Sequence, residues 1–490
     1  MKMIIGGQKV DSSDKSTITI VNPATQKVLD TVPAATKEDV NRALDLSKIG
    51  FEKWRKTSLL EREKIFNKFM QLLDENYRYF IKVLSEECGK VPARAAFEVS
   101  GVKDIFKGYI ETAKRNYGKV LVPGTEAGQE KDLTMVVHEP IGTVVALVPF
   151  NAPLMLFGYK AAPALAAGNA LIVKPPSDNP SAVIRAVELL IEAGVPGEAV
   201  QVITGRGSEL GNMLIDDPRV DAVTMIGSTA VGKQVAEGLA KRLSPCSLEL
   251  GGNDPFIVMP DADLDKAAAQ AAFTRTGNAG QVCNSPKRFI IHSSVIDEFT
   301  EKLLAIVKNI KMGYPDDVDA EIDKFLNGEP TDVPMCPTIS ERAAKEIERQ
   351  INLTIEQGAT LLYGGKRDGA YVEPTILTNV TRDMDIANDM EIFGPVLPIL
   401  SFETVEEAID IANQSCYGLS GCVFTKDWKL GMKVSQRVDS AAMIINSTSL
   451  YRNMMQPFGG WKSSGMSQES TITLGEMMIE KTIVLKDFLD

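Results

Sequence analysis

One cysteine lies in a glycine-containing turn that could present its thiol for chemistry. The stretch is Gly277-Asn278-Ala279-Gly280-Gln281-Val282-Cys283-Asn284-Ser285-Pro286-Lys287-Arg288, between a helix-like run (264–276) and a strand-like run (288–292). A thiol on a turn between two rigid elements is positioned and reachable, whereas a structural cysteine more often lies within an apolar run. Cys283 is therefore a candidate reactive thiol. On this stretch alone, an unreactive loop cysteine is the more common interpretation.

A carboxylate closes an apolar strand pattern. Glu249 lies in the run 247–250, just before Gly251-Gly252. A carboxylate in such a place is costly unless it is hydrogen-bonded or functional. If it is buried, desolvation raises its pKa, which suits a general base. The chain has only two histidines, His138 and His292, so a carboxylate is the expected base and a multi-histidine metal site is not expected.

Two features could bind a nucleotide. The run Gly227-Ser228-Thr229-Ala230-Val231-Gly232 follows a strand pattern and opens a helix pattern. Its glycines would let backbone amides approach a pyrophosphate at the positive end of a helix. The spacing is not G-x-G-x-x-G, and an ordinary strand-to-helix turn is an equal alternative. Lys174 ends another strand before Pro175-Pro176 and could bond ribose hydroxyls or a 2′-phosphate, although alone it is better interpreted as a solvated lysine.

A strand–helix alternation over residues 141–250 positions these residues. The strands are continuously apolar and the helices amphipathic, as in a parallel sheet covered on both faces. Such a sheet binds ligands beyond the carboxyl ends of its strands, which is where the polar and glycine residues gather. The predicted strands are 143–148, 170–174, 200–203, 222–226 and 247–250, and the predicted helices are 153–167, 179–193, 208–215 and 230–242.

The rest of the chain adds a helical region, a second alternation and two β-prone segments. Residues 37–117 have helical periodicity. Residues 119–140 and the tail 477–485 contain β-prone runs that could pair outside their own domain. Residues 313–338 are acidic, contain four prolines and are predicted to be an inserted loop. After Pro260, the predicted helices are 264–276, 295–310, 340–358, 404–414 and 427–437, and the predicted strands are 288–292, 396–401, 421–424 and 442–445.

Composition limits the class of protein. A chain of 490 residues is too long for one compact core, so two or more domains are expected. The net charge of −12 disfavours nucleic acid and anionic membranes as partners. The six cysteines contain no CxxC pair and form no disulfide framework. Without an N-terminal signal pattern or a membrane-length apolar run, we expect a cytoplasmic protein with reduced thiols.

Taken in order, these motifs resemble the aldehyde dehydrogenase superfamily nearly end to end. The resemblance is carried by Asn22-Pro23-Ala24-Thr25, Asn151, Lys174, 227–232, Leu248-Glu249-Leu250-Gly251-Gly252, Cys283, Glu391-Ile392-Phe393-Gly394-Pro395, and Pro457-Phe458-Gly459-Gly460 with Lys462 and Gly465. It implies an α/β fold with a Rossmann-like parallel-sheet cofactor domain (1–118 and 141–250), a second α/β catalytic domain (251–465) and a β-strand oligomerisation arm (119–140 and 466–490). It also implies a homodimer or homotetramer, NAD or NADP as coenzyme, and no metal.

The resemblance further implies that an aldehyde is oxidised through a covalent thiohemiacetal and a thioester. Cys283 matches the nucleophile, and Asn151 with the Cys283 N–H matches the oxyanion hole. Glu249 matches the general base that activates the hydrolytic water. Lys160 and Glu469 match a polar relay behind the base, with ordinary structural contacts as an equal alternative. The matched coenzyme positions are Pro149, Phe150, Lys174, Ser177, Gly205, Gly227, Ser228, Gly232, Leu250, Glu391 and Phe393. The matched substrate positions are Leu156, Tyr159, Val282, Asn284, Arg452 and Phe458.

Two positions depart from the family's pattern. Ser177 stands where NAD-specific members often have a glutamate, which would repel a 2′-phosphate. NADP is therefore admissible, although the neighbouring Asp178 could restore some repulsion. Arg452 stands where several members have an aromatic residue, and it could pair with a carboxylate, phosphate or sulfonate of the substrate. A solvated loop arginine is an equal alternative.

The sequence thus predicts a non-acylating, NAD(P)-dependent aldehyde dehydrogenase for a small, polar or anionic aldehyde. Semialdehydes, lactaldehyde-like hydroxyaldehydes and glyceraldehyde 3-phosphate are the candidate substrates. A CoA-acylating semialdehyde dehydrogenase is one alternative, but such members usually lack the base found here as Glu249. A non-catalytic binding or structural member is the other alternative, and intact Cys283, Glu249 and Asn151 argue against it.

Overall fold

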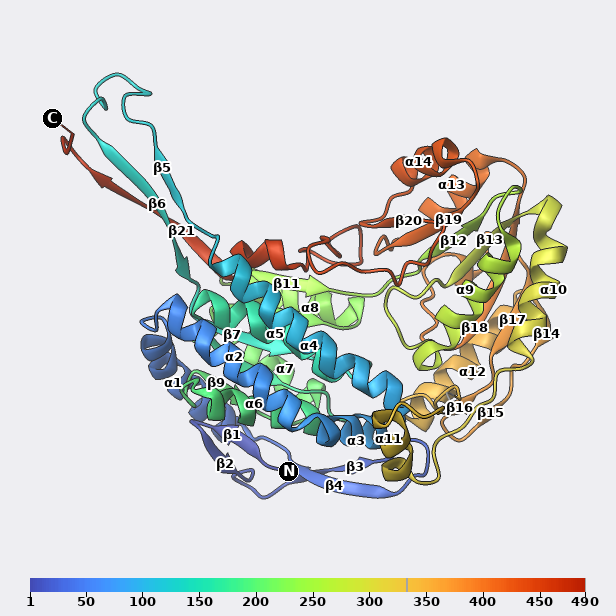
Figure 1. Ribbon diagram of the computed structural model, residues 1–490, viewed down its shortest axis with the longest axis horizontal. Coiled ribbons are helices and arrows are strands. Elements are labelled where there is room, and N and C mark those ends of the chain that lie inside the picture. Colours follow the sequence, from blue (N-terminus) through green and yellow to red (C-terminus); the bar gives the residue numbers. More distant parts are fainter. Residues whose placement is uncertain (332–333, 490) are drawn as a thin grey trace.

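Two seven-stranded sheets and a projecting three-stranded sheet build the protein in the computed structural model, which describes residues 1–331 and 334–489 (Figure 1). The first sheet has the order β11 (Cys246–Glu249), β10 (Ala222–Ile226), β7 (Thr143–Leu147), β8 (Ala170–Lys174), β9 (Val200–Val202), β1 (Met3–Ile5) and β2 (Gln8–Val10). The second has the order β14 (Thr360–Tyr363), β17 (Thr375–Val380), β18 (Val396–Phe402), β13 (Arg288–His292), β12 (Pro255–Val258), β19 (Gly421–Phe424) and β20 (Met443–Ile445). These sheets confirm the predicted α/β fold.

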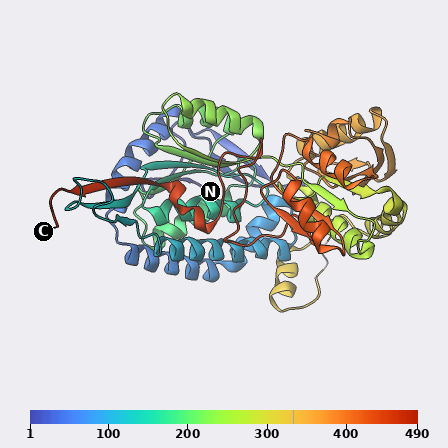
Figure 2. The ribbon, with the colours of Figure 1, turned by 90° about the horizontal axis from the view of Figure 1, so that it is seen from above.

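Helices cover both faces of the first sheet. They are α1 (Lys37–Trp54), α2 (Leu59–Glu75), α3 (Tyr77–Cys88), α4 (Pro92–Ala113), α5 (Pro153–Ala167), α6 (Ser181–Ala193), α7 (Gly207–Ile215) and α8 (Thr229–Ala240). In β7, Val144 and Ala146 pack with α2 to α6, whereas Val145 packs with α1, α7 and α8. The side chains on both faces of the sheet are apolar because helices bury both faces. Figure 2 shows the sheet between these two helical layers.

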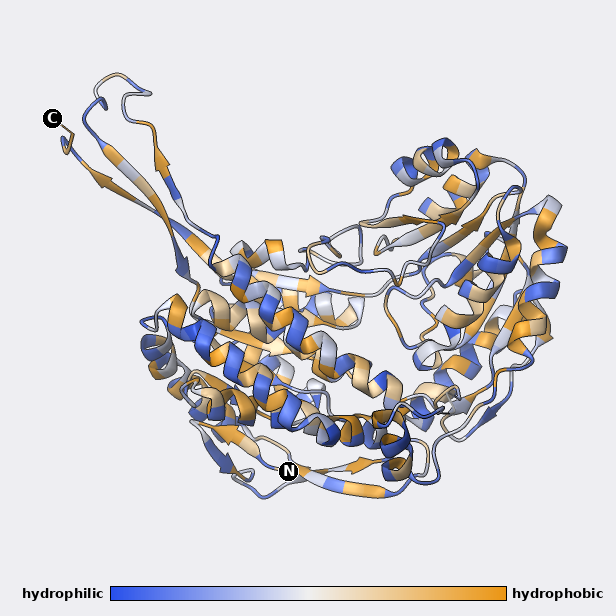
Figure 3. Cartoon of the chain, in the orientation of Figure 1, coloured by the Kyte–Doolittle hydropathy of each residue, from blue (hydrophilic) through white to orange (hydrophobic). Residues whose placement is uncertain are grey.

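The second sheet is built in the same way. Its helices are α9 (Leu264–Thr276), α10 (Ile296–Val307), α12 (Glu341–Glu356), α13 (Val405–Asn413) and α14 (Trp428–Arg437). Phe256 and Phe289 face α9 and α10, whereas Ile257 and Ile290 face α12, α13 and α14. The strands are parallel except for β14 at one edge. In Figure 3 the strands are mostly orange and lie between helices with blue outer faces.

A three-stranded antiparallel sheet projects from this body. It has the order β21 (Met478–Leu485), β6 (Leu133–Pro140) and β5 (Lys119–Leu121), and Figure 1 shows it leading away from the first sheet with the C-terminus at its far end. All but the first residue of β21 are exposed. The two predicted β-prone segments therefore pair with each other.

Short elements complete the described chain. They are the strands β3 (Thr17–Val21), β4 (Val28–Pro33), β15 (Arg367–Asp368) and β16 (Tyr371–Val372), and the 3-10 helices η1 (Gly277–Gly280), η2 (Ser293–Val295), η3 (Asp385–Ala387) and η4 (Thr471–Met477). Within the described residues, no helix is long and apolar enough to cross a membrane.

The acidic segment 313–338 differs from the predicted loop, because it carries the helix α11 (Val318–Leu326). Asp317 caps this helix through a bond from the backbone N–H of Ala320. Arg78 and Lys82 of α3 both form ion pairs with Asp319, so α11 contacts the helical layer that covers the first sheet. The part of the prediction that falls on 332–333 lies outside the described residues.

Candidate active site

The turn that carries Cys283 has an unusual backbone conformation. After α9 ends, Asn278, Ala279 and Gly280 all have positive φ, at 53°, 52° and 74°. A Cβ at position 280 would collide with the carbonyl group of Gly394, so only glycine fits there. Asparagine tolerates the left-handed conformation better than alanine does, and such conformations persist only where the surroundings impose them. The turn is therefore held by its neighbours.

Asn151 is one of those neighbours, and it lies across from the cysteine turn. Its side-chain amide donates to the carbonyl oxygen of Gln281 at 3.1 Å. In the other direction, the Asn278 side chain donates to the Asn151 carbonyl oxygen at 3.0 Å. The buried Lys90 donates to the same oxygen at 2.6 Å and pairs with Glu98. The sequence-predicted Asn151 and Cys283 thus belong to one bonded unit.

Cys283 itself is partly exposed. Burial of its surroundings raises the pKa of the thiol well above its usual value, and the nearby charge of Glu249 raises it further. The carbonyl of Cys283 lies close to Gly252, where a Cβ would stand 2.8 Å from the oxygen. A thiol in this environment needs a base or a nearby positive charge to become a thiolate.

Glu249 is buried at the carboxyl end of β11, where the sequence places it. Its exposed fraction is 2%, and Oε1 makes no hydrogen bond to any described residue. Burial raises the pKa of Glu249, and the charge of Glu469 raises it further. Gly459 approaches this carboxylate, since a Cβ there would lie 3.5 Å from Oε1. The group can therefore be protonated near neutral pH and can exchange a proton with a small molecule beside it.

Behind Glu249, three charged side chains form a network in which Lys160 and Glu469 are buried and Arg452 is half-buried. Lys160 Nζ lies 2.9 Å from Oε1 of Glu469, and Arg452 Nη2 lies 2.9 Å from Oε2. The Arg452 guanidinium lies between two aromatic rings, 4.4 Å from the centre of Tyr159 and 4.0 Å from that of Phe458. Burial acts to raise the pKa of Glu469, but Lys160 and Arg452 outweigh it and keep that pKa below its ordinary value. The predicted relay residues and the predicted substrate arginine are thus in direct contact.

Polar groups meet at the carboxyl end of β8. Lys174 Nζ donates to Ser177 Oγ at 3.3 Å, and Ser177 Oγ donates to the carbonyl oxygen of Gly205 at 3.0 Å. Burial lowers the pKa of Lys174 to about 8, while Asp178 acts in the opposite direction. A buried lysine beside a hydroxyl and a carbonyl can bind ribose hydroxyls or a phosphate.

The neighbouring strand-to-helix turn also fits a phosphate. Ser228 caps α8 by accepting a bond from the Val231 N–H. Gly227 donates its N–H to the carbonyl of Glu249 at 3.0 Å. A Cβ at Gly232 would collide with Leu250, so this glycine lets the helix approach β11. The N–H groups of Thr229 and Ala230, which make no bond to the cap, are the ones that an anion could accept from.

Glu391 and Phe393 come from the second sheet's side and face these strands. Glu391 Oε1 accepts a bond from the Gly252 N–H at 3.1 Å. The ring of Phe393 lies edge-on to Phe150, with 6.0 Å between the ring centres. Pro149 and Phe150 are half-buried in the loop after β7. Of the predicted coenzyme residues, Glu391 and Phe393 thus contact the loops that follow strands of the first sheet.

Comparison with known proteins identifies the family. The chain matches the family model described as the aldehyde dehydrogenase family over residues 9–484. The chain belongs to the aldehyde dehydrogenase family. Family membership confirms the predicted class of enzyme, an NAD(P)-dependent aldehyde oxidoreductase.

Characterised aldehyde dehydrogenases are similar along nearly the whole chain. A D-glyceraldehyde dehydrogenase (NADP(+)) from Picrophilus torridus is 34% identical, over 91% of this chain and 88% of that protein. A 3-sulfolactaldehyde dehydrogenase from Priestia aryabhattai is 35% identical, over 99% and 97%. A solved structure of 3,6-anhydro-L-galactose dehydrogenase in complex with NAP has a TM-score of 0.92 at 32% identity, over 99% of each chain.

The remaining predicted substrate residues of this aldehyde dehydrogenase differ in how far they are buried and in whether their side chains are already hydrogen-bonded. Leu156 and Tyr159 are buried on α5, and the Tyr159 hydroxyl contacts Met454 Sδ at 3.4 Å. Val282 is half-buried. Asn284 is buried, and its amide donates to the carbonyl oxygen of Ser449 at 2.7 Å, so this side chain is already engaged with the backbone.

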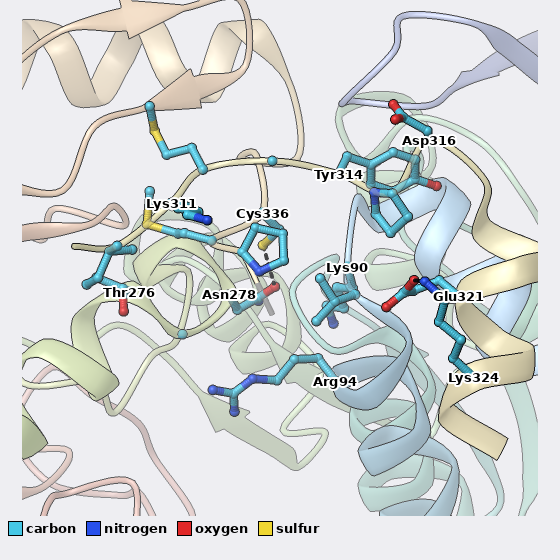
Figure 4. Close-up of a pocket in the computed structure, with 18 of the residues that line it drawn as sticks. Lys90, Arg94, Thr276, Asn278, Lys311, Tyr314, Asp316, Glu321, Lys324 and Cys336 are labelled. Carbon is cyan, nitrogen blue, oxygen red and sulfur yellow. Dashed lines mark hydrogen bonds and ion pairs between the residues drawn. The ribbon is translucent and has the colours of Figure 1, made fainter. Parts of the chain in front are cut away.

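A cavity of about 940 Å³ lies behind the cysteine turn of the dehydrogenase. Figure 4 shows Thr276 and Asn278 on one side of it, Tyr314, Glu321 and Lys324 on the other, and Lys90 between them. Cys283, Glu249 and Asn151 do not line it. This cavity is bounded by the acidic inserted segment and is separate from the residues expected to do chemistry.

Two lysines of the site were not predicted from the sequence. Lys90 bonds the backbone of Asn151, and Lys287 bonds the backbone of Cys283. Lys90 lies between Gly89 and Val91 at a helix break, and Lys287 follows Pro286, so both resemble solvated loop lysines in the sequence. A possible signal was their closeness to motif residues, since Lys287 lies within the stretch that contains Cys283.

Proposed function

We propose that this aldehyde dehydrogenase oxidises a small, polar or anionic aldehyde to the carboxylic acid through covalent catalysis at Cys283. The observation that carries the proposal is the placement of three groups. Cys283 lies on a strained turn, Asn151 is bonded to that turn, and Glu249 is buried with a free oxygen within electrostatic range of the thiol.

In the first half of the reaction, the Cys283 thiol releases its proton to solvent water, and the thiolate sulfur forms a bond to the aldehyde carbon. The carbonyl electron pair moves to oxygen, where the Asn151 amide and the Cys283 N–H donate hydrogen bonds to it. Such a donor typically stabilises the transition state by about 3 kcal/mol. NAD(P)+, when bound, accepts the hydride that leaves the same carbon. The carbon–oxygen double bond re-forms, and Cys283 then carries a thioester.

In the second half, Glu249 acts on water. Its carboxylate takes a proton from the water as the oxygen attacks the thioester carbon, and the Cys283 sulfur leaves as thiolate. The raised pKa of Glu249 makes it a stronger base than an ordinary glutamate. A CoA-acylating reaction would not need this base, which is why hydrolysis is the preferred proposal.

The residues present fit either coenzyme. Lys174 and Ser177 form a polar site without a carboxylate at the position of Ser177, so nothing at that position repels a 2′-phosphate. We propose that NADP is accepted. The relative from Picrophilus torridus is named for NADP(+), which supports the same proposal.

Arg452 is the proposed binding group for a substrate anion. It is 19% exposed, and its Nε makes no hydrogen bond to any described residue. Its charge is already shared with Glu469, so a substrate anion would join an existing pair. Relatives named for D-glyceraldehyde and 3-sulfolactaldehyde support a small polar or anionic substrate.

We also propose that the arm formed by β5, β6 and β21 joins two subunits. The outer edge of β21 has no paired strand among the described residues, and exposed sheet edges pair readily with another chain.

A substrate screen tests the proposal. The purified enzyme is given neutral aldehydes, hydroxyaldehydes, semialdehydes and sulfonated or phosphorylated aldehydes with each coenzyme, and both reduced coenzyme and free acid are measured. We expect equal amounts of the two. In Arg452→Met, the KM for anionic aldehydes should rise about tenfold while that for neutral ones changes little. Equal changes for both classes would contradict the role of Arg452, and a CoA thioester in place of free acid would contradict hydrolysis.

A further inference from the structure

Lys287 is buried although its side chain carries a charge. It follows Cys283 by four residues, stands just before β13, and its side chain is 2% exposed. Lysine is rarely buried without partners. Its ammonium donates to the carbonyl oxygens of Cys283, of Val282 at 3.3 Å and of Ser285 at 3.3 Å. The three N–H groups of an ammonium thus meet three carbonyls of the turn that carries the thiol.

The same ammonium reaches the carboxylate of Glu391. Lys287 Nζ lies 3.3 Å from Oε1, the oxygen that also accepts the Gly252 N–H. Oε2 lies beside Gly251, where an added Cβ would stand 2.5 Å from it, and it makes no hydrogen bond to any residue described. One oxygen of Glu391 is therefore held by the protein, and the other is left to accept a hydroxyl.

Lys287 consequently has four acceptors for three N–H groups. Its charge is shared between the cysteine turn and Glu391, so a change at Glu391 alters the share left for Cys283. Burial raises the pKa of the Cys283 thiol; of the smaller effects, Lys287 lowers this pKa and Glu391 raises it. The geometry and the charges thus point to one connection between the two residues.

We propose that Lys287 is a positioning residue that couples Glu391, on the coenzyme side, to the reactivity of the Cys283 thiol. The inference rests on the proposed function, in which Glu391 accepts hydroxyls of the nicotinamide ribose and Cys283 attacks the aldehyde. When Glu391 gives part of its negative charge to a hydrogen-bonded hydroxyl, more of the Lys287 charge acts on the cysteine turn. The pKa of the Cys283 thiol then falls, and more of it is ionised, once the coenzyme is bound.

Alkylation of Cys283 tests this coupling without turnover. The full-length enzyme is treated with iodoacetamide over a range of pH, and modification of the Cys283 peptide is followed by mass spectrometry. In Lys287→Met we expect the rate at neutral pH to fall about tenfold, as for a shift of about one pKa unit. In Glu391→Gln we expect the rate to rise, because Lys287 no longer shares its charge. In the double variant, Glu391→Gln should raise the rate clearly less than it does in the presence of Lys287, because only its direct effect on the thiol remains.

Two further variants separate the coupling from a merely structural effect. Lys287→Arg keeps the charge and should recover most of the alkylation rate. Lys302→Met removes a half-buried lysine that pairs with Asp265, far from the cysteine turn in sequence, and it should alkylate like the wild type. If Lys287→Met does not fold, Glu391→Gln alone still decides, since an unchanged alkylation rate would overturn the proposal.

Additive effects in the double variant would also overturn the coupling. A wild-type enzyme that oxidises no aldehyde would instead overturn the proposed function, and it would leave the alkylation result intact. The two failures are therefore distinguishable.

Discussion

Glu249 and Glu469 share one buried corner of the molecule, yet their surroundings drive them toward opposite charge states. Glu469 is paired with Lys160 and Arg452 at 2.9 Å each, and those charges keep its pKa low. Glu249 has a free Oε1 and a pKa raised by burial and by Glu469. One carboxylate is fixed as a charge, and the other is left able to gain and lose a proton.

The raised pKa of Glu249 predicts how activity and stability depend on pH. Hydrolysis of the thioester should fail on the acid side at a pH well above the ordinary pKa of glutamate, about 4.3. Folding stability depends on pH in the opposite direction from activity. A carboxyl with a folded pKa above its unfolded pKa binds protons more tightly when folded, so the fold loses stability as pH rises between the two values. Glu249→Gln should therefore raise Tm more at alkaline pH than at pH 4, as calorimetry can show.

Glu469→Gln should strongly destabilise the protein, because the buried Lys160 and the half-buried Arg452 would remain without their partner carboxylate. Breaking a buried ion pair in this way costs about 3–5 kcal/mol in the free energy of unfolding. The matched control is Glu406→Gln, which removes an exposed carboxylate that also lies between a lysine and an arginine, Lys433 and Arg437. Surface pairs contribute about 0–1 kcal/mol. Equal losses in urea unfolding of the two variants would contradict the buried network.

Gly280→Ala should damage the turn before Cys283. Its φ of 74° is unfavourable for alanine, and the added Cβ would collide with Gly394. We expect a loss of about 1–3 kcal/mol and slower alkylation of Cys283. Gly475→Ala is the control, because its φ is not positive and a Cβ there meets no atom within 4 Å. If Gly280→Ala behaved like Gly475→Ala, the turn would not depend on this glycine.

Ser177→Glu should change the coenzyme preference. A carboxylate beside Lys174 would repel a 2′-phosphate and would accept bonds from free ribose hydroxyls. We expect the Kd for NADP+ to rise at least about tenfold while the Kd for NAD+ changes little or falls, as coenzyme titration can measure. A parallel loss of affinity for both coenzymes would mean that the substitution disrupts the loop and does not discriminate the phosphate.

Local patterns predicted much of the fold. The strands at 288–292 and 421–424 and the helix at 264–276 have the predicted bounds. The strands β12, β14 and β17 were missed, because they are only four to six residues long and short apolar runs carry no clear periodicity. The helix α11 was missed because its acidic, proline-flanked sequence favours a loop; it is held by Arg78 and Lys82, which are far away in the sequence.

The candidate site was predicted by motif residues, but its electrostatics were not. The sequence alone does not tell which of Glu249 and Glu469 is ionised. Their pKa values differ because of the contacts that each carboxylate makes in the fold. Similarly, Lys287 looks solvated in the sequence, because the residue types around it do not reveal that the turn folds the carbonyls of residues 282, 283 and 285 around its ammonium. The assignment of Arg452 to a substrate anion stays a prediction, and the structure adds its pairing with Glu469.

Trapping the thioester tests the central proposal most directly. Glu249→Gln should still form the thiohemiacetal and pass the hydride, but it should lack the base for hydrolysis. When this variant is mixed with an aldehyde and NAD(P)+, we predict one equivalent of reduced coenzyme per active site and an acyl adduct on Cys283, detected by mass spectrometry. Cys283→Ala should form neither while still binding the coenzyme. Steady turnover in Glu249→Gln, or an adduct on another residue, would contradict this account.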